Sequence, residues 1–273
     1  TGDNNVAVGY AALDANTTAS DNTAVGFQAL TANTTGADNV AVGRSALLAN
    51  TTGTNNTALG SYSLATNITS IDNTAVGDYA LHSNTAAGNT GIGSSALLTN
   101  SSGANNTAVG MDALAANTTS SNNTAVGKDA LLANTTGTAG TAVGKGSLAS
   151  NTTGTDNTGL GALALNATTT GGLNVAVGRS ALQSNTTGAN MTAVGYNAGL
   201  SHTTGNSSTF IGTDSGKLTT TGVGNTFVGD GSGRQNTTGA SNVAVGQSAL
   251  LANTTAANNT AVGYNSLIAN TTG

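Results

Sequence analysis

The segment Asn22-Thr23-Ala24-Val25-Gly26 decides the fold, because close copies of it recur along the whole chain. Its side chains alternate in the manner of a β-strand and lack the three-to-four-residue spacing of a helix. Sixteen copies follow one another at intervals of 17 residues, apart from one interval of 16. The closing glycines of the copies are Gly9, Gly26, Gly43, Gly60, Gly77, Gly93, Gly110, Gly127, Gly144, Gly161, Gly178, Gly195, Gly212, Gly229, Gly246 and Gly263.

A short regular period is typical of a solenoid, because one unit cannot bury its own apolar side chains and must stack on its neighbours. We therefore predict an all-β fold, a parallel β-solenoid (β-roll or β-helix) of sixteen coils with a 17-residue repeat. The array is uninterrupted, so residues 1–273 are predicted to form a single β-solenoid repeat array without a linker. Both ends of the sequence fall within equivalent corners of the repeat, and we expect a segment of a longer fibre.

The composition excludes several classes of protein. Charged residues make up 6% of the 273 residues, the formal net charge is -5, and 37% of the residues are hydrophobic, whereas disordered chains combine low hydrophobicity with high net charge. The six Lys and Arg residues are scattered, so no nucleic-acid partner is expected. No segment approaches the roughly 20 apolar residues of a membrane span, and the absence of Cys excludes disulfides and thiolate metal sites.

Within one coil, the pattern predicts which side chains face inward. The residue before each glycine is aliphatic, as at Val25, and the residue three places before it is Thr or Val, as at Thr23, so both are expected in the core. A second short strand is expected over residues 27–32, with its first two side chains in water. Residues 33–36, Asn-Thr-Thr-Gly, have the composition of a corner turn.

Two columns of asparagine are expected to hold the corners. Each amide should bond its own corner backbone and the identical amide one coil away, which satisfies groups that a turn leaves unpaired. The first column, the corner Asn ladder, comprises Asn16, Asn33, Asn50, Asn67, Asn84, Asn100, Asn117, Asn134 and Asn151. The second comprises Asn5, Asn22, Asn39, Asn56, Asn73, Asn89, Asn106 and Asn123.

The residue two places before each glycine is nearly always Ala or Gly, although alternation would turn it outward. Uniformly small side chains on an exposed face indicate close packing against another surface. The predicted self-association face comprises Ala24, Ala41, Ala58, Ala75, Ala108, Ala125, Ala142, Ala176, Ala193, Phe210 and Phe227. In and next to the coils with Phe210 and Phe227, the usual Leu of the following segment becomes Gly199, Gly216 and Gly233. This exchange of volume indicates that the two columns touch, either across a subunit interface or inside one chain with an Ala inner layer.

No catalytic, cofactor or metal site is predicted. Neither histidine has partner residues in the sequence. We interpret His82 as a solvent-facing residue and His202 as a replacement in the corner column. Carboxylates recur at one corner, where they are best interpreted as turn caps, with calcium binding as the alternative. These carboxylates are Asp21, Asp38, Asp72 and Asp156.

The corner Asn-Thr-Thr segments match the N-glycosylation rule, although corner geometry explains them without sugar. Threonine-rich solenoids also raise ice binding as an alternative function. Because the corner residues Thr17 and Thr18 are adjacent, an extended strand would point them to opposite faces, which disfavours one flat rank of threonines.

The phrases at residues 39–43, 174–178 and 242–246, each reading Asn-Val-Ala-Val-Gly, resemble the head repeat of trimeric autotransporter adhesins. The resemblance recurs over essentially the whole chain, although that family's repeat is nearer fourteen residues. It implies left-handed β-rolls that associate as trimers and bind host or matrix surfaces. Similar arrays look like those of phage tail-fibre proteins and bacterial surface-fibre proteins.

We therefore expect a non-enzymatic, extracellular or cell-surface fibre shaft or adhesin stalk that associates with itself, a virion fibre being the alternative location. Trimers follow from the resemblance, as does a host or matrix surface or glycan as a further partner. An enzyme would need at least one coil with convergent acid, base or nucleophile residues, and the repeat contains no such coil.

Overall fold

The computed structural model describes residues 2–272, which form strands and turns without any helix. Contacts divide the chain into two units, Thr1–Thr138 and Ala139–Gly273, and each unit contributes eight strands of three residues. The first unit contains β1 (Val6–Val8), β2 (Thr23–Val25), β3 (Val40–Val42), β4 (Thr57–Leu59), β5 (Thr74–Val76), β6 (Thr90–Ile92), β7 (Thr107–Val109) and β8 (Thr124–Val126). The second contains β9 (Thr141–Val143), β10 (Thr158–Leu160), β11 (Val175–Val177), β12 (Thr192–Val194), β13 (Thr209–Ile211), β14 (Thr226–Val228), β15 (Val243–Val245) and β16 (Thr260–Val262).

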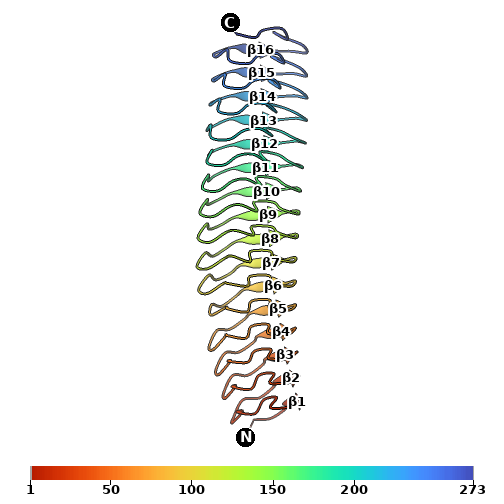
Figure 1. Ribbon diagram of the computed structural model, residues 1–273, viewed down its shortest axis with the longest axis vertical. Helices are drawn as coiled ribbons and strands as arrows, with labels where there is room; N and C mark the ends of the chain where they lie inside the picture. The colour runs from red at the N-terminus through yellow and green to blue at the C-terminus, as the bar shows by residue number, and fades with distance from the viewer. Residues whose placement is uncertain (1, 273) are drawn as a thin grey trace. The chain divides into compact units, whose positions relative to one another are not determined.

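Consecutive strands of each unit pair in parallel, with identical repeat positions side by side. Ala24 of β2 pairs with Ala41 of β3, and Ala176 of β11 pairs with Ala193 of β12. Figure 1 shows the coils of each unit stacked one on the next, with one strand in each coil. The predicted parallel β-solenoid with a 17-residue repeat is confirmed.

The single 16-residue interval leaves the strand register intact. Thr74 of β5 still pairs with Thr90 of β6. The missing residue is lost from the corner instead, since Asn84 and Asn89 are five residues apart where the equivalent Asn33 and Asn39 are six apart. The Asn84 and Asn89 amides bond each other at 3.0 Å. The corners therefore absorb length changes that a parallel ladder cannot tolerate.

The middle residue of each strand from β2 to β16 is buried in the core, which corrects the predicted orientation. Ala24 is fully buried, whereas Thr23 and Val25 on either side of it are half-buried. The predicted self-association face is wrong for the same reason, since all its members are fully buried within the chain and none is available to a partner. These buried members are Ala24, Ala41, Ala58, Ala75, Ala108, Ala125, Ala142, Ala176, Ala193, Phe210 and Phe227.

Small residues line the strand side of the core because the opposite wall supplies the bulk. Ala29 and Leu30 are both fully buried, and the equivalent leucines fill the interior of nearly every coil. An aliphatic side chain larger than Ala on the strand would compete with this leucine for the same space. The first and third residues of each strand, such as Thr23 and Val25, therefore face outward.

The expected second strand over residues 27–32 does not form. The Ala29 N–H instead donates to the Gly26 carbonyl at 3.4 Å, which closes a turn. Gln28 and Leu30 adopt φ values of 55° and 53°, in the left-handed region that bulky residues rarely enter. Links between coils offset this strain, since the Leu30 N–H donates to the Ala46 carbonyl at 2.9 Å.

The exchange of large and small residues takes place inside the core of the second unit. Phe210 and Phe227 are fully buried and stack with their ring centroids 5.6 Å apart. A Cβ atom added to Gly233 would lie 2.5 Å from the Phe227 ring, and one added to Gly216 would lie 2.5 Å from the Phe210 ring. The phenyl rings occupy the volume that leucine fills elsewhere, so contact between the two columns within one chain is confirmed.

Candidate functional site

The most extensive surface feature is the outer face, which we define as the first and third residues of every strand. Its third residues are Val, Leu or Ile, and its first residues are Thr or Val. Leu59 and Ile92 lie in middle coils of the first unit, away from its end coils, and are 38% and 39% exposed. The outer face thus presents two uncharged ranks of β-branched and aliphatic side chains in register, spaced by about 4.8 Å from coil to coil.

The outer face was missed in the sequence because larger side chains were assigned to the core. The exchange of Phe210 and Phe227 with glycine gave the signal for the correct orientation, since two columns that touch inside one chain must both face inward. Contiguous exposed apolar side chains mark interaction surfaces in soluble proteins. The outer face is therefore the leading candidate for a functional surface in each unit.

The corner Asn ladder is present along most of its predicted length, with a gap at the buried Asn67 Oδ1, which lacks a hydrogen-bond partner. The Asn50 Nδ2 atom donates to Asn33 Oδ1 at 3.0 Å and to the Gly53 carbonyl at 3.0 Å. The same amide-to-amide bond links Asn67 to Asn50 and Asn117 to Asn100. Because these amides are fully buried, their mutual bonds satisfy polar groups that would otherwise destabilise the corner.

Burial of the ladder bears on the glycosylation motifs. Asn33, in the motif formed with Thr34 and Thr35, is fully buried, and its Nδ2 atom already donates to the Gly36 carbonyl at 2.9 Å. A glycan on this nitrogen would have no room in the folded corner. The Asn-Thr-Thr motifs are thus explained by corner geometry.

His202 replaces the ladder amide in one coil of the second unit. Its side chain is fully buried, Nδ1 lies 3.3 Å from Asn185 Oδ1, and Nε2 lacks a hydrogen-bond partner. Burial lowers the pKa of the imidazole from 6.5 to about 4, against a smaller, opposite influence of the Gly222 backbone, which lies outside hydrogen-bond geometry. Met191 and Ser208 also replace amides of the second Asn column nearby, so both asparagine columns are locally incomplete.

The other titratable residues singled out in the sequence lie in turns. His82 is half-buried beside Tyr79, with ring centroids 5.3 Å apart. Asp21 and Asp72 are exposed at φ values of 60° and 58° and accept hydrogen bonds from neighbouring Asn side chains. Asp38 and Asp156 occupy the same left-handed position, where Asp is favoured.

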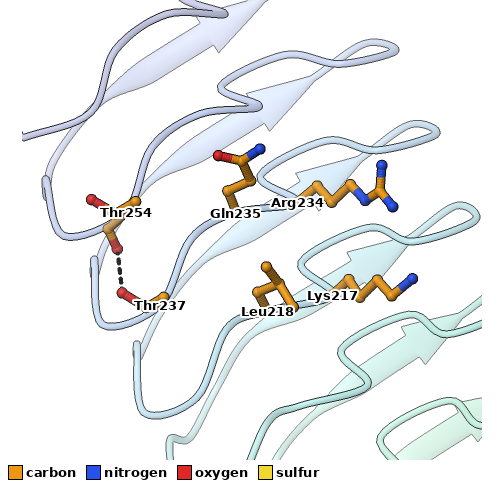
Figure 2. A pocket seen from close by; sticks show the side chains of 6 residues that line it. All are labelled: Lys217, Leu218, Arg234, Gln235, Thr237 and Thr254. Atoms are coloured by element: carbon orange, nitrogen blue, oxygen red, sulfur yellow. Dashed lines mark hydrogen bonds between the residues drawn. The ribbon is translucent and has the colours of Figure 1, made fainter.

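A second candidate site is a surface pocket of about 590 Å³ in the second unit, shown in Figure 2. Beside it, the carboxylate of Asp214 accepts from Lys217 Nζ at 3.1 Å and pairs with an Arg234 terminal nitrogen at 3.3 Å. Burial acts to raise the pKa of Asp214, but hydrogen bonds from Asn197 and Lys217 and the charges of Lys217 and Arg234 together hold it below its usual value. The pocket is lined by Lys217, Leu218, Arg234, Gln235, Thr237 and Thr254.

No family model matches the chain, and no curated protein is similar to it in sequence.

Across residues 2–272, no group of three or more His, Cys, Asp or Glu side chains lies close enough together to hold a metal ion. The same range contains no helix long and apolar enough to cross a membrane. The outer face and the pocket are therefore the two candidate functional sites among the described residues.

Proposed function

We propose that this protein is a structural extracellular fibre segment, a shaft or adhesin stalk, that associates with itself through the outer face. The observation that carries the proposal is the unbroken, uncharged outer face of each unit. An exposed apolar stripe of this regularity costs free energy in water, and its burial against another copy recovers about 25 cal/mol for each Å² of apolar surface removed from water.

A second copy suits the outer face better than an unrelated partner does. Both ranks repeat once per coil, so two identical faces share one spacing and can match along their length. β-Branched side chains on facing sheets interdigitate, as they do in the core of a β-sandwich. The outer face carries no charge that would oppose close approach.

The resemblance to the head repeats of trimeric autotransporter adhesins supports a trimer and a place on a cell surface. Phage tail fibres would use the same architecture on a virion. In either case the role is mechanical display, without catalysis.

The proposal predicts that charge on the outer face prevents assembly without unfolding the chain. In a variant carrying Leu59→Lys and Ile92→Lys, the association constant should fall by at least about a hundredfold, because burying an unpaired ammonium group costs several kcal/mol. Sedimentation velocity measures the assembly, and circular dichroism confirms that the fold is retained.

Lys128→Ala, at an exposed position outside the outer face, is the control and should assemble like the unmodified chain. A stable, folded monomer of the unmodified chain at micromolar concentration would contradict self-association.

Ice binding is a second candidate function, favoured by one specific observation. Thr is the first residue of twelve of the sixteen strands, so the outer face presents threonine in register within each unit. Measuring thermal hysteresis together with sedimentation distinguishes a self-associating fibre from an ice-binding protein. Association without hysteresis supports the fibre, whereas hysteresis from a monomer supports ice binding.

A further inference from the structure

The sixteen coils provide an internal comparison for every surface position. The fifth residue after the closing glycine is Lys217 in the coil of β13 and Arg234 in the coil of β14. No other coil has a cation at this position, and most have an uncharged residue such as Leu, Ala, Thr, Asn or Gln. Like charges on adjacent rungs of a parallel ladder, about 4.8 Å apart, repel each other and destabilise the fold.

Asp214 relieves only part of this repulsion. It bonds both cations, and it also accepts a hydrogen bond from Asn197 Nδ2 at 3.0 Å. One carboxylate serves two cations, so the cluster retains positive charge in a chain whose net charge is -5. A departure from the repeat that brings two like charges onto adjacent coils is typical of a functional site.

The next position departs from the repeat in the same two coils. The sixth residue after the glycine is Ala, Ser or Thr in the other fourteen coils, but here it is Leu218 and Gln235. Leu218 is 43% exposed, an unfavourable position for an unpaired leucine. Both residues line the pocket together with Lys217 and Arg234, so two independent exceptions to the repeat meet at one place.

The chemistry of this lining indicates the class of ligand. Figure 2 shows the Lys217 and Arg234 side chains running parallel in one direction, with Leu218 and Gln235 at their backbone ends and the hydroxyls of Thr237 and Thr254 further along on that side. The volume falls within the range of roughly 300–1,000 Å³ typical of small-molecule sites. The cations suit a carboxylate, the Leu218 side chain suits an apolar C–H face, and the Gln235 amide suits hydroxyl groups.

We propose that this pocket binds an acidic saccharide, with its carboxylate held by Lys217 and Arg234 and its sugar ring placed against Leu218 and Gln235. The ligand carboxylate shares the two cations with Asp214. Since none of these residues belongs to the outer face, binding does not depend on self-association, and each proposal can fail without the other.

The repeat itself supplies substitutions that suit the fold. Lys217→Leu and Arg234→Leu introduce the residue found at this position in Leu48, Leu98 and Leu251. Asp214→Asn introduces the residue found at the equivalent Asn197. Lys128→Ser introduces the residue found at the equivalent Ser61 and is a matched control in the first unit.

The test is calorimetric titration of the intact chain with digalacturonate, its dimethyl ester and sodium acetate. We expect the acid to bind at least about tenfold more tightly than the ester or acetate, a difference of about 1.4 kcal/mol. The double variant Lys217→Leu, Arg234→Leu should lose this preference. Asp214→Asn should bind the acid more tightly, because it removes the competing carboxylate, and Lys128→Ser should behave like the unmodified chain.

Three outcomes with the unmodified chain would overturn the proposal. They are equal affinity for the acid and its ester, acetate binding as tightly as the disaccharide acid, and no heat of binding at about 10 mM acid, which corresponds to a free energy weaker than about 3 kcal/mol. Unchanged binding in the double variant would have the same consequence. Circular dichroism of each variant separates loss of binding from loss of fold.

Discussion

Truncation of one buried phenylalanine should destabilise the second unit strongly, and a leucine placed opposite it should restore most of the loss. Phe227→Ala removes a fully buried ring that lies against Gly233, and Phe→Ala substitutions in cores cost about 3–5 kcal/mol. Gly233→Leu alone should also destabilise, by about 1–3 kcal/mol, because its side chain would overlap the ring.

The double variant Phe227→Ala, Gly233→Leu recreates the arrangement of Ala244 and Leu250 in the next coil. The backbone already suits leucine, since Gly233 has a φ of 55° and Leu250 a φ of 54°. Urea unfolding should therefore find the double variant more stable than either single variant. Additive losses would contradict the conclusion that the two columns share one volume.

Protonation of His202 at low pH should lower the unfolding free energy of the second unit. The loss should be larger than in an otherwise identical chain with asparagine at this position. The folded pKa of about 4 lies below the unfolded value of 6.5, so the unfolded chain binds the proton more tightly. The resulting stability is fully present above pH 6.5 and is lost as the pH falls towards 4. Each pKa unit between the folded and unfolded values is worth about 1.4 kcal/mol, so the loss of unfolding free energy is about 3 kcal/mol.

His202→Asn is the matched variant because it restores the ladder residue and removes the titration. Unfolding free energies at pH 7 and pH 4 should show the larger drop in the unmodified chain, against a background of carboxylate titration common to both. An equal drop in the two chains would mean that the imidazole is already protonated or that it is exposed to water.

The repeat period, the parallel stacking and the corner Asn ladder could be predicted from the sequence, because each depends on a pattern repeated sixteen times. A three-residue strand such as Thr23–Val25, in contrast, allows either face to point inward. Size alone favoured Val25 for the core. The opposite wall decides the matter, since Leu30 already fills the interior and leaves room only for Ala24.

The turn that carries Leu30 could not be predicted, because a leucine at positive φ contradicts local preference and is retained by hydrogen bonds to the next coil. Similarly, Lys217 and Arg234 appear scattered along the sequence. The 17-residue spacing between them was the available signal, since it places equivalent positions on adjacent coils.

Thiol labelling tests the central claim most directly, because the chain contains no cysteine of its own. Single variants Ala108→Cys and Val109→Cys place a thiol on the inner and outer faces of the same strand, β7. Because the inner face is buried, Ala108→Cys should stay unreactive in the folded chain. Val109→Cys should react in dilute protein and become protected as the concentration rises and copies associate. Equal reactivity at the two positions would contradict the fold, and reactivity at Val109→Cys that does not change with concentration would contradict self-association through the outer face.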